Sequence, residues 1–435
     1  MNVELLGHAT IIVRTSRTCI IFDPVLSDPF EDGAVTSYPP RCIDQSALPP
    51  LDAIVISHRH PDHLDVCSLA SLPRSTPLIC PKDAHILALA HAMDFRDIRV
   101  AHAGVSLSVG DLTLIPTASD FDDLPELGFL VIHSDGIVWN QVDTEIAPEN
   151  AAALRRMHGP VSLHLARYAS QNFEFFEDRR LCFPVTEHLR NLAVTVEIDA
   201  GCVVPASAGF CFAEPHAWLN AFMFPISPER FIAELRILEP SLHAVEASPG
   251  DVFGITQAGV EHCVGAAQSV PRTSLDPDLC RFDPSAPIPA LADPNLKGRD
   301  SDELYRYLDR WVDRLTEWLS CNDSVPELYP LRDDGLAYRL EVIGPIGARW
   351  TWDLLIRSSA VDVWRKPYLT PVMTFAVAAS IFADWLTFEC SMYLLRAYRR
   401  TWSTALELSR DDNGTCARAV PFIDLPAAWL RAKVA

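Results

Sequence analysis

Basic residues are scarce in this sequence. Lysine and arginine number 36 against 57 aspartates and glutamates, which gives a formal net charge of −21 at pH 7. Nucleic acids and anionic membrane surfaces favour partners rich in lysine and arginine, so this balance argues against both. No run of these residues marks a phosphate site, and no glycine-rich fingerprint marks a nucleotide or a flavin. An acidic small molecule remains compatible with the composition, because a bound metal ion can supply local positive charge.

Long apolar runs and paired cysteine motifs are missing as well. The longest apolar stretch, near 371–388, is interrupted by Asp384 and predicts a buried helix rather than a membrane span. None of the twelve cysteines forms a CxxC pair, and the Cys/His pairs that hold a Rieske cluster are absent. The first residues also lack the features of a signal peptide. We therefore expect a cytoplasmic protein without a membrane span, whose cysteines are mostly small buried hydrophobic residues.

The sequence contains enough hydrophobic residues to form more than one hydrophobic core. Its 435 residues are 49% hydrophobic, which predicts two or three domains. Residues 1–270 alternate between strand-like and helix-like segments and predict an α/β unit. Residues 271–299 carry six prolines and predict a linker, and residues 300–435 predict a small α+β domain.

Several expectations concern single helices and strands. Ser227 before a proline predicts the start of a helix, and Asp300 with Glu303 predicts a capping box at the start of another. The apolar segment 192–198 predicts a strand, and the segment at about 373–387 predicts a helix. The apolar stripe of the helix after Asp300 comprises Leu304, Leu308, Trp311, Leu315 and Trp318.

The stretch VISHRHPDHLD at 55–65 is the strongest chemical pattern in the chain. It places His58, His60, Asp62 and His63 directly after an apolar strand. Imidazole and carboxylate groups suit Zn, Fe and Mn. Residues two apart point the same way in an extended chain, so His58 and His60 can face one ion while Asp62 and His63 face a second. The alternative is a solvated polar loop, which does not explain why an apolar strand leads straight into it.

The same stretch gives the chain a resemblance to a known family. Residues 58–63, His-Arg-His-Pro-Asp-His, resemble the H-x-H-x-D-H signature of the metallo-β-lactamase superfamily. LLGHATIIV, IFDPVLS and GFLVIHSDGIVWNQVDTE resemble hairpins that stand before and after that signature. The resemblance covers roughly residues 1–265. It implies an α/β fold, the αββα metallo-β-lactamase sandwich, followed here by the α+β domain.

The resemblance also implies roles for particular residues. His58 and His60 would bind the first metal ion, Asp62 and His63 the second, and Asp143 both. Asp62 and Asp143 are then the candidate catalytic residues. An ordinary acid in a turn is the alternative for Asp143.

Other residues near the motif are expected to support the ligands rather than to bind metal. His8, Asp23 and Asp65 are expected to orient the ligands. His164 is expected to be buried in a strand, with metal binding as the lesser alternative.

One position departs from the superfamily pattern. A third histidine of the first metal site would follow a strand at IPTASDFDDLPE, where this chain has Ser119. Loss of the histidine means either a crippled site or a carboxylate in its place. A carboxylate would make an oxygen-rich site that favours iron or manganese over zinc. The candidates, each of which alone would pass for a solvated loop acid, are Asp120 and Glu126 first, with Asp122 and Asp123 between them.

A narrower resemblance concerns the chemistry. The spacing Asn140-x-x-Asp143 and the stretch VVPASAGFCFAEPHAWLN resemble proteins like CMP-N-acetylneuraminate hydroxylase, which hydroxylate with O2. Within that stretch His216 becomes the candidate last ligand of the second metal ion, or else a core or surface histidine. Those proteins carry a Rieske domain that this sequence lacks, so electrons would come from an external reductant. The C-terminal domain resembles a sterol-carrier-type module, which often contributes an apolar cavity or an oligomer contact.

Three functions follow from these patterns. The favoured one is an O2-activating oxygenase or hydroxylase with two metal ions, iron before zinc or manganese, acting on an organic small molecule. The alternative is a hydrolase of an ester, amide or phosphodiester that uses metal-activated water. The third is a non-enzymatic binding or assembly module formed with the C-terminal domain, with a decayed site. A homo-oligomer is compatible with each of these functions. The intact set of His58, Asp62 and His63 argues against decay.

Overall fold

The computed structural model divides the chain into two compact units. Unit 1 comprises Met1–Asn172 and Phe183–Asp283, and unit 2 comprises Phe173–Cys182 and Pro284–Ala435. The structure describes residues 1–121, 124–169, 171, 175–176, 183–273, 276, 278–321, 335–357, 360–404, 406–411, 414–419 and 422–434.

Two large sheets form the centre of unit 1. The first has eight strands, in the order β16 (Gly259–Cys263), β15 (Val252–Thr256), β1 (Asn2–Gly7), β2 (Thr10–Arg14), β3 (Cys19–Phe22), β5 (Ala53–Val55), β6 (Leu78–Pro81) and β7 (Ile98–Ala101). The second has six, in the order β13 (Cys202–Ala206), β12 (Leu163–Arg167), β11 (Gly136–Asn140), β10 (Leu127–His133), β9 (Leu112–Ala118) and β8 (Leu107–Val109). A small ribbon pairs β14 (Phe210–Phe212) with β4 (Val35–Ser37).

The main core of unit 1 lies between these two sheets. It joins Val13 and Phe22 of the first sheet to Leu114, Phe129 and other apolar residues of the second, all fully or almost fully buried. Alternate residues of each strand point into this layer. The burial of each large aliphatic or aromatic side chain stabilises the sandwich by roughly 1.5–3 kcal/mol.

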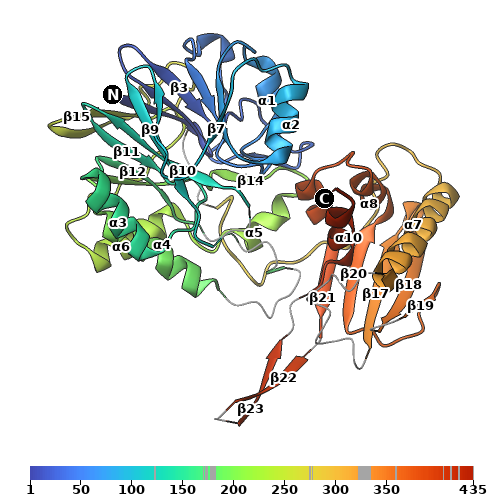
Figure 1. The fold of residues 1–435 in the computed structure, drawn as a ribbon. Coiled ribbons are helices and arrows are strands. Elements are labelled where there is room, and N and C mark those ends of the chain that lie inside the picture. Colours follow the sequence, from blue (N-terminus) through green and yellow to red (C-terminus); the bar gives the residue numbers. More distant parts are fainter. Residues whose placement is uncertain are drawn as a thin grey trace. The chain divides into compact units, whose positions relative to one another are not determined.

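Helices cover the outer faces of both sheets, as Figure 1 shows. A second apolar cluster joins the first sheet to α1 (Val66–Ser71) and α2 (Ala84–Ala92). A third joins the second sheet to α3 (Pro148–His158), α4 (Val185–Ile198) and α6 (Pro228–Leu238), and α5 (Asn220–Met223) follows β14. The layers therefore run helix, sheet, sheet, helix, which confirms the predicted fold class.

The local signals for helices were only partly reliable in unit 1. The start of α6 is confirmed, since the Ser227 side chain accepts a hydrogen bond from the Arg230 backbone N–H and Pro228 is the first helical residue. The strand predicted at 192–198 is wrong, because these residues form the second half of α4. Buried positions in α4 recur three or four residues apart, and this helical period becomes visible only when the segment is read from Val185.

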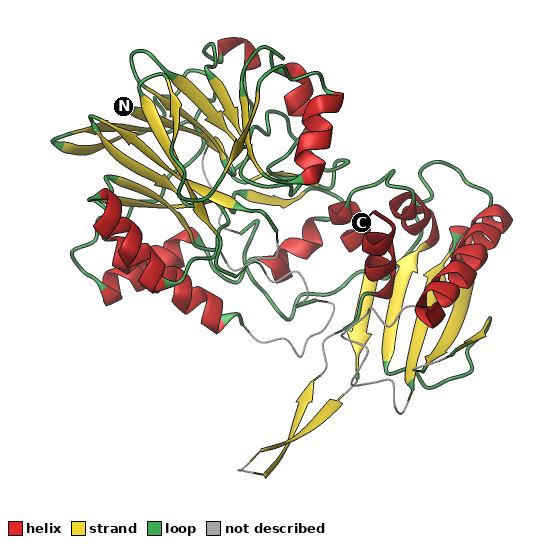
Figure 2. Cartoon of the chain, in the orientation of Figure 1, coloured by secondary structure: helices red, strands yellow, loops and turns green. Residues whose placement is uncertain are grey.

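Unit 2 is built on a five-stranded sheet with helices packed on it (Figure 2). Its strands are β19 (Val361–Trp364), β18 (Arg349–Ile356), β17 (Leu336–Ile343), β20 (Met373–Ala378) and β21 (Arg399–Ser403). A separate hairpin pairs β22 (Leu406–Asp411) with β23 (Gly414–Ala419). The helices are α7 (Ser301–Cys321), α8 (Ala379–Leu386), α9 (Met392–Ala397) and α10 (Leu425–Val434).

The helix predicted at about 373–387 is half wrong. Met373–Ala378 forms β20, between β17 and β21, and only then does α8 begin. All six residues of β20 are buried. A strand buried on both faces is a continuous apolar run, which periodicity cannot separate from a buried helix.

The long helix α7 follows its prediction closely. The Asp300 carboxylate accepts hydrogen bonds of 3.0 Å from the backbone N–H groups of Asp302 and Glu303. The predicted stripe is buried except for Trp318, which is half-buried. Trp311 packs edge-on against Phe382 of α8 and Trp429 of α10.

Two sequence expectations concern cysteines and membrane spans. Ten cysteines of the described part of the chain are free, and only four of these ten are buried, so the expectation of mostly buried cysteines is wrong. In the same ranges, none of the helices combines the length and the apolar character that crossing a membrane requires.

Candidate metal centre

The histidine motif leaves the carboxyl end of β5, inside the parallel part of the first sheet. β5 pairs in parallel with β3 and β6, and its three residues are fully buried. Open α/β sheets bind ligands at the carboxyl ends of their parallel strands. The chain then turns tightly, because the His63 and Leu64 backbone N–H groups both donate to the His60 carbonyl. This turn faces the four side chains of the motif toward a small region.

His58 and His60 point ring nitrogens at each other. The His58 Nε2 and His60 Nδ1 atoms lie 2.8 Å apart, and His58 Nδ1 lies 2.9 Å from the Ser57 hydroxyl. The serine therefore fixes which nitrogen of His58 is available. His58, His63 and Asp143 also place one donor atom each within 4.8 Å of one another. We refer to His58, His60, His63 and Asp143 as the first cluster.

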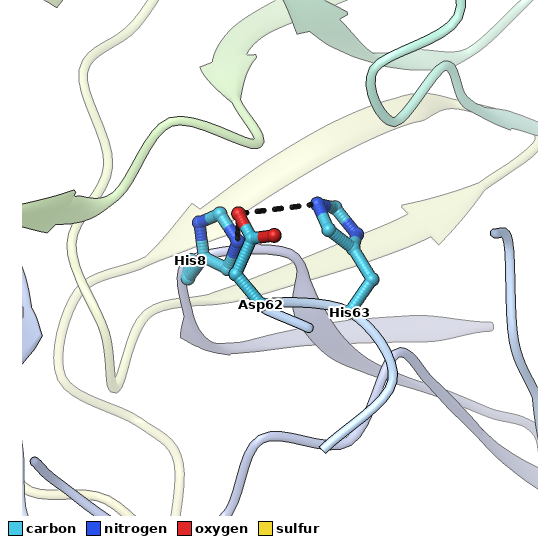
Figure 3. A group of neighbouring side chains, drawn as sticks. All are labelled: His8, Asp62 and His63. Atoms are coloured by element: carbon cyan, nitrogen blue, oxygen red, sulfur yellow. Dashed lines mark ion pairs between the residues drawn. The ribbon is translucent and has the colours of Figure 1, made fainter. Parts of the chain in front are cut away.

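A second cluster consists of His8, Asp62 and His63, and Figure 3 shows both imidazole rings beside the Asp62 carboxylate. The Asp62 Oδ2 atom lies 3.2 Å from His8 Nε2 and 3.8 Å from His63 Nε2. His63 Nε2 also lies 3.2 Å from the Asp143 Oδ2 atom. One histidine nitrogen is therefore shared by both clusters, as in a centre for two neighbouring ions.

Asp23 holds this shared histidine in place. Its carboxylate lies 3.0 Å from His63 Nδ1 and accepts hydrogen bonds of 2.7 Å from the Ser57 backbone N–H and hydroxyl. Asp23 is fully buried. A carboxylate on the far nitrogen of a metal-binding histidine fixes the tautomer and the ring orientation. This placement agrees with the orienting role expected for Asp23.

The surroundings of the two clusters raise the pKa of one histidine and lower the pKa of another. Burial lowers the pKa of His63, but the charges of Asp143 and Asp62 and the hydrogen bond that its ring makes to the Asp23 carboxylate outweigh it and raise that pKa well above its usual value. Burial and the neighbouring His63 hold the pKa of His58 well below its usual value. Burial raises the pKa of Asp62, yet the charges of His63 and His8 hold it below its usual range. The negative charges at the centre thus favour a cation there.

The first residues of the loop where a third histidine would stand form hydrogen bonds away from both clusters. The Ser119 hydroxyl accepts a hydrogen bond from the Glu145 backbone N–H. Asp120 is exposed, and its carboxylate accepts hydrogen bonds from the Ala147 backbone N–H and the Asn150 side chain. Asp120 is therefore outside both clusters. Asp122 and Asp123 lie outside the described residues.

Glu126 is the described acid of this loop whose backbone neighbour is hydrogen-bonded to the residue before the histidine motif. It is 5% exposed, and the backbone N–H of the next residue, Leu127, donates to the Ser57 carbonyl at 3.1 Å. That hydrogen bond brings the start of β10 beside the residue that precedes His58. Glu126 belongs to neither cluster in the structure, but its carboxyl is buried on this side of the sandwich.

Three other predicted residues lie apart from the clusters. Asp65 caps α1, where its carboxylate accepts hydrogen bonds from the Ser68 backbone N–H and hydroxyl. His216 is buried at the start of a single 3-10 turn, Ala217–Leu219. His164 is buried in β12, stacked 4.5 Å from Trp139 with its Nε2 atom 2.9 Å from the Gln141 side chain, and burial lowers its pKa to about 3.

His8 was expected to orient the ligands rather than to bind metal. In the structure its ring faces the Asp62 carboxylate directly. It lies in the turn between β1 and β2 with a φ of 51°, next to Gly7 at 111°. The signal in the sequence was the Gly-His pair at the tip of an otherwise apolar hairpin.

A family model matches part of this unit. Residues 18–160 match the family described as the beta-lactamase superfamily domain. The chain is 26% identical over 167 residues to a UPF0173 protein of Pyrococcus abyssi, a match covering 38% of this chain and 69% of that protein. It is 36% identical over 76 residues to an uncharacterised protein of Mycobacterium tuberculosis, covering 17% of this chain and only 20% of that relative.

Solved structures give similar but distant matches. CmlA, a diiron β-hydroxylase from Streptomyces venezuelae, shows 17% identity and a TM-score of 0.37, over 48% of this chain and 45% of that one. An isothiocyanate hydrolase from Delia radicum gut bacteria shows 16% identity and a TM-score of 0.42, over 59% of this chain and 100% of that one. The resemblances to the neuraminate hydroxylases and to sterol carriers stay predictions. The family match, the two-sheet sandwich and the motif at 58–63 together show that the chain contains a metallo-β-lactamase superfamily domain.

Proposed function

We propose that this chain is a dinuclear metalloenzyme that uses O2 to oxidise an organic small molecule, with iron as its metal. The observation that carries the proposal is the donor set of each cluster. His58 and His63 with Asp143, and His8 and His63 with Asp62, each offer two imidazoles and one carboxylate. Two histidines and one carboxylate with open positions are typical of non-haem iron oxygenases.

The residues present fit a pair of cations. His8 and His63 are buried, and within the described residues neither Nε2 atom has a hydrogen-bond partner. A buried polar atom without a partner destabilises the fold unless a ligand satisfies it. Glu126 is the described carboxyl that we propose for the place of the missing third histidine, since it is buried and adjoins Ser57 through Leu127.

The chain itself supplies orientation and access. Ser57 and Asp23 fix the ring nitrogens that His58 and His63 present. The Asp143 side chain is 30% exposed and His60 is exposed, so this side of the centre is open to an incoming molecule. Iron bound here would supply the activation of O2, and an external reductant would supply electrons.

Hydrolysis of an ester, amide or phosphodiester is the second candidate function. The observation in its favour is that Asp143 lies beside the histidine shared by both clusters, as the bridging carboxylate of a two-metal hydrolytic site would. The cofactor in that case would be zinc or manganese.

The test is the metal content of protein produced with iron and purified without oxygen, together with its absorption spectrum before and after exposure to air. About two irons per chain and a spectrum that changes with O2 would support the oxygenase. Zinc and no response to O2 would refute it in favour of the hydrolase. His102→Ala serves as the control, because this exposed histidine lies outside both clusters.

A further inference from the structure

We propose that His8 is itself a metal ligand and that it completes the second metal site in place of His216. This inference rests on the proposed dinuclear centre. It adds that the N-terminal hairpin, rather than the segment after β13, supplies the last histidine of that site.

The distances at the second cluster suit direct coordination. Neighbouring donor atoms are separated by 3.2 Å between His8 and Asp62, 3.8 Å between Asp62 and His63, and 3.2 Å between His63 and Asp143. Two ligand atoms that each lie about 2.1 Å from one metal ion in tetrahedral geometry are about 3.4 Å apart. The donor atoms of His8, Asp62 and His63 are therefore spaced as ligands of one ion, with Asp143 on the other side of His63.

The burial of His8 points the same way. Its side chain is fully buried, and within the described part of the chain neither ring nitrogen has a hydrogen-bond partner. The Nε2 atom faces the Asp62 carboxylate at 3.2 Å. A metal ion between the two would satisfy both.

The backbone holds His8 in this place at a cost. Its φ of 51° is in the left-handed region that residues other than glycine rarely adopt. The Arg41 guanidinium donates hydrogen bonds of 2.8 Å to the Leu6 and Gly7 carbonyls just before it, and the Phe210 ring packs edge-on at 5.4 Å. A strained residue that its surroundings fix so fully is a candidate for function.

None of the described residues of β13 belongs to either group of potential metal ligands. That strand ends at Ala206, and the next residue, Ser207, lines a cavity of about 70 Å³ together with His8 and Asn140. A neutral serine hydroxyl is a poor ligand for zinc or iron beside imidazole and carboxylate. Among the described residues, His216 is in neither group of potential ligands.

The test is a titration of metal-free protein with Co²⁺ without oxygen, followed by absorbance, which needs no catalytic activity. The variants are His8→Gln and His8→Glu, which share a side-chain length and the same backbone strain but differ in the ability to bind metal. Wild type should take up two ions. His8→Gln should take up one tightly and bind the second at least 100-fold more weakly, while His8→Glu restores the second ion and His216→Ala behaves as wild type.

Two results would overturn the assignment in different ways. If wild type and His8→Gln both bind two ions with equal affinity, His8 is not a ligand, while the dinuclear centre stands. If wild type binds no metal, the proposed function falls as well. A circular dichroism spectrum of each variant, with His8→Glu as the matched control, separates a lost ligand from a lost fold.

Discussion

Units 1 and 2 both bury charged groups, but they satisfy them differently. In unit 2, the fully buried Asp353 accepts hydrogen bonds from the Arg339 guanidinium and from the Tyr368 and Leu369 backbone N–H groups. In unit 1, buried imidazoles and carboxylates converge and leave ring nitrogens without partners. Buried polar groups that are all hydrogen-bonded to one another stabilise the fold, whereas buried polar groups without partners can bind a ligand. The comparison therefore separates a structural use of buried charge from a binding use.

The most direct way to break this comparison is to remove the histidine that both clusters share. His63→Ala should lose both metal ions, because its Nε2 atom faces Asp143 and Asp62 and no other described nitrogen does both. Elemental analysis of anaerobically purified protein measures the loss, with His102→Ala as the control. Retention of two ions would show that the clusters are not the metal centre.

The matching change in unit 2 is Asp353→Asn. It keeps the shape of the side chain but leaves the Arg339 charge unpaired, so unit 2 should lose about 3 kcal/mol of unfolding free energy. This is the low end of the range for breaking a buried ion pair, because the Arg339 side chain is 20% exposed. Denaturant unfolding measures it. Metal content should stay at the wild-type value, and a fall would contradict the separation of roles.

The same aspartate predicts a dependence on pH. Burial raises the pKa of Asp353, but the hydrogen bonds from Arg339, Tyr368 and Leu369 outweigh it and hold the pKa below its usual value. A group whose pKa is lower in the folded state stabilises the fold above its unfolded pKa of about 4 and loses that effect as pH falls through the folded pKa. Wild-type unit 2 should therefore lose stability below about pH 4. Asp353→Asn should show a shallower loss in the same range.

Arg41 sharpens the comparison inside unit 1, since it is a buried charge that is fully paired. It binds the Asp28 carboxylate and the carbonyls just before His8. Lysine cannot reproduce the planar fork, so Arg41→Lys should let the His8 turn relax. We expect the affinity of the second site alone to fall about 10–100-fold, as for other groups that orient ligands. The Co²⁺ titration measures it, and equal weakening of both sites would point to a general loss of structure.

The smallest expected effect concerns the loop acids. Asp120→Ala removes a hydrogen bond to the Ala147 backbone and should cost about 1 kcal/mol without changing metal content. Glu126→Gln should instead lower occupancy of the first site with little change in stability. Comparing the metal content of these two variants shows which carboxylate binds metal at the position of the missing histidine. Unchanged metal content in both would mean that neither does.

The sequence predicted the sandwich and its main motif because both depend on local patterns. The run before His58 and the spacing of His58, His60, Asp62 and His63 are visible in a few adjacent residues. The contact between His8 and Asp62 cannot be seen in adjacent residues. It depends on how the tip of the N-terminal hairpin lies relative to a loop much later in the chain. Segments 192–198 and 373–387 failed for a related reason, because neighbouring elements decide whether an apolar run becomes a strand or a helix.

The position of His8 at the end of β1 also sets an order of events during synthesis of the chain. His58, His63 and Asp143 all emerge early, whereas β1 gains its second neighbour only when β15 is made. Chains fold as they emerge, from the N-terminus onward. The first cluster can therefore assemble on a nascent chain, while the second becomes rigid only after the last strands of the first sheet have arrived. Binding of metal at both clusters would then occur only after the two-sheet sandwich has folded completely.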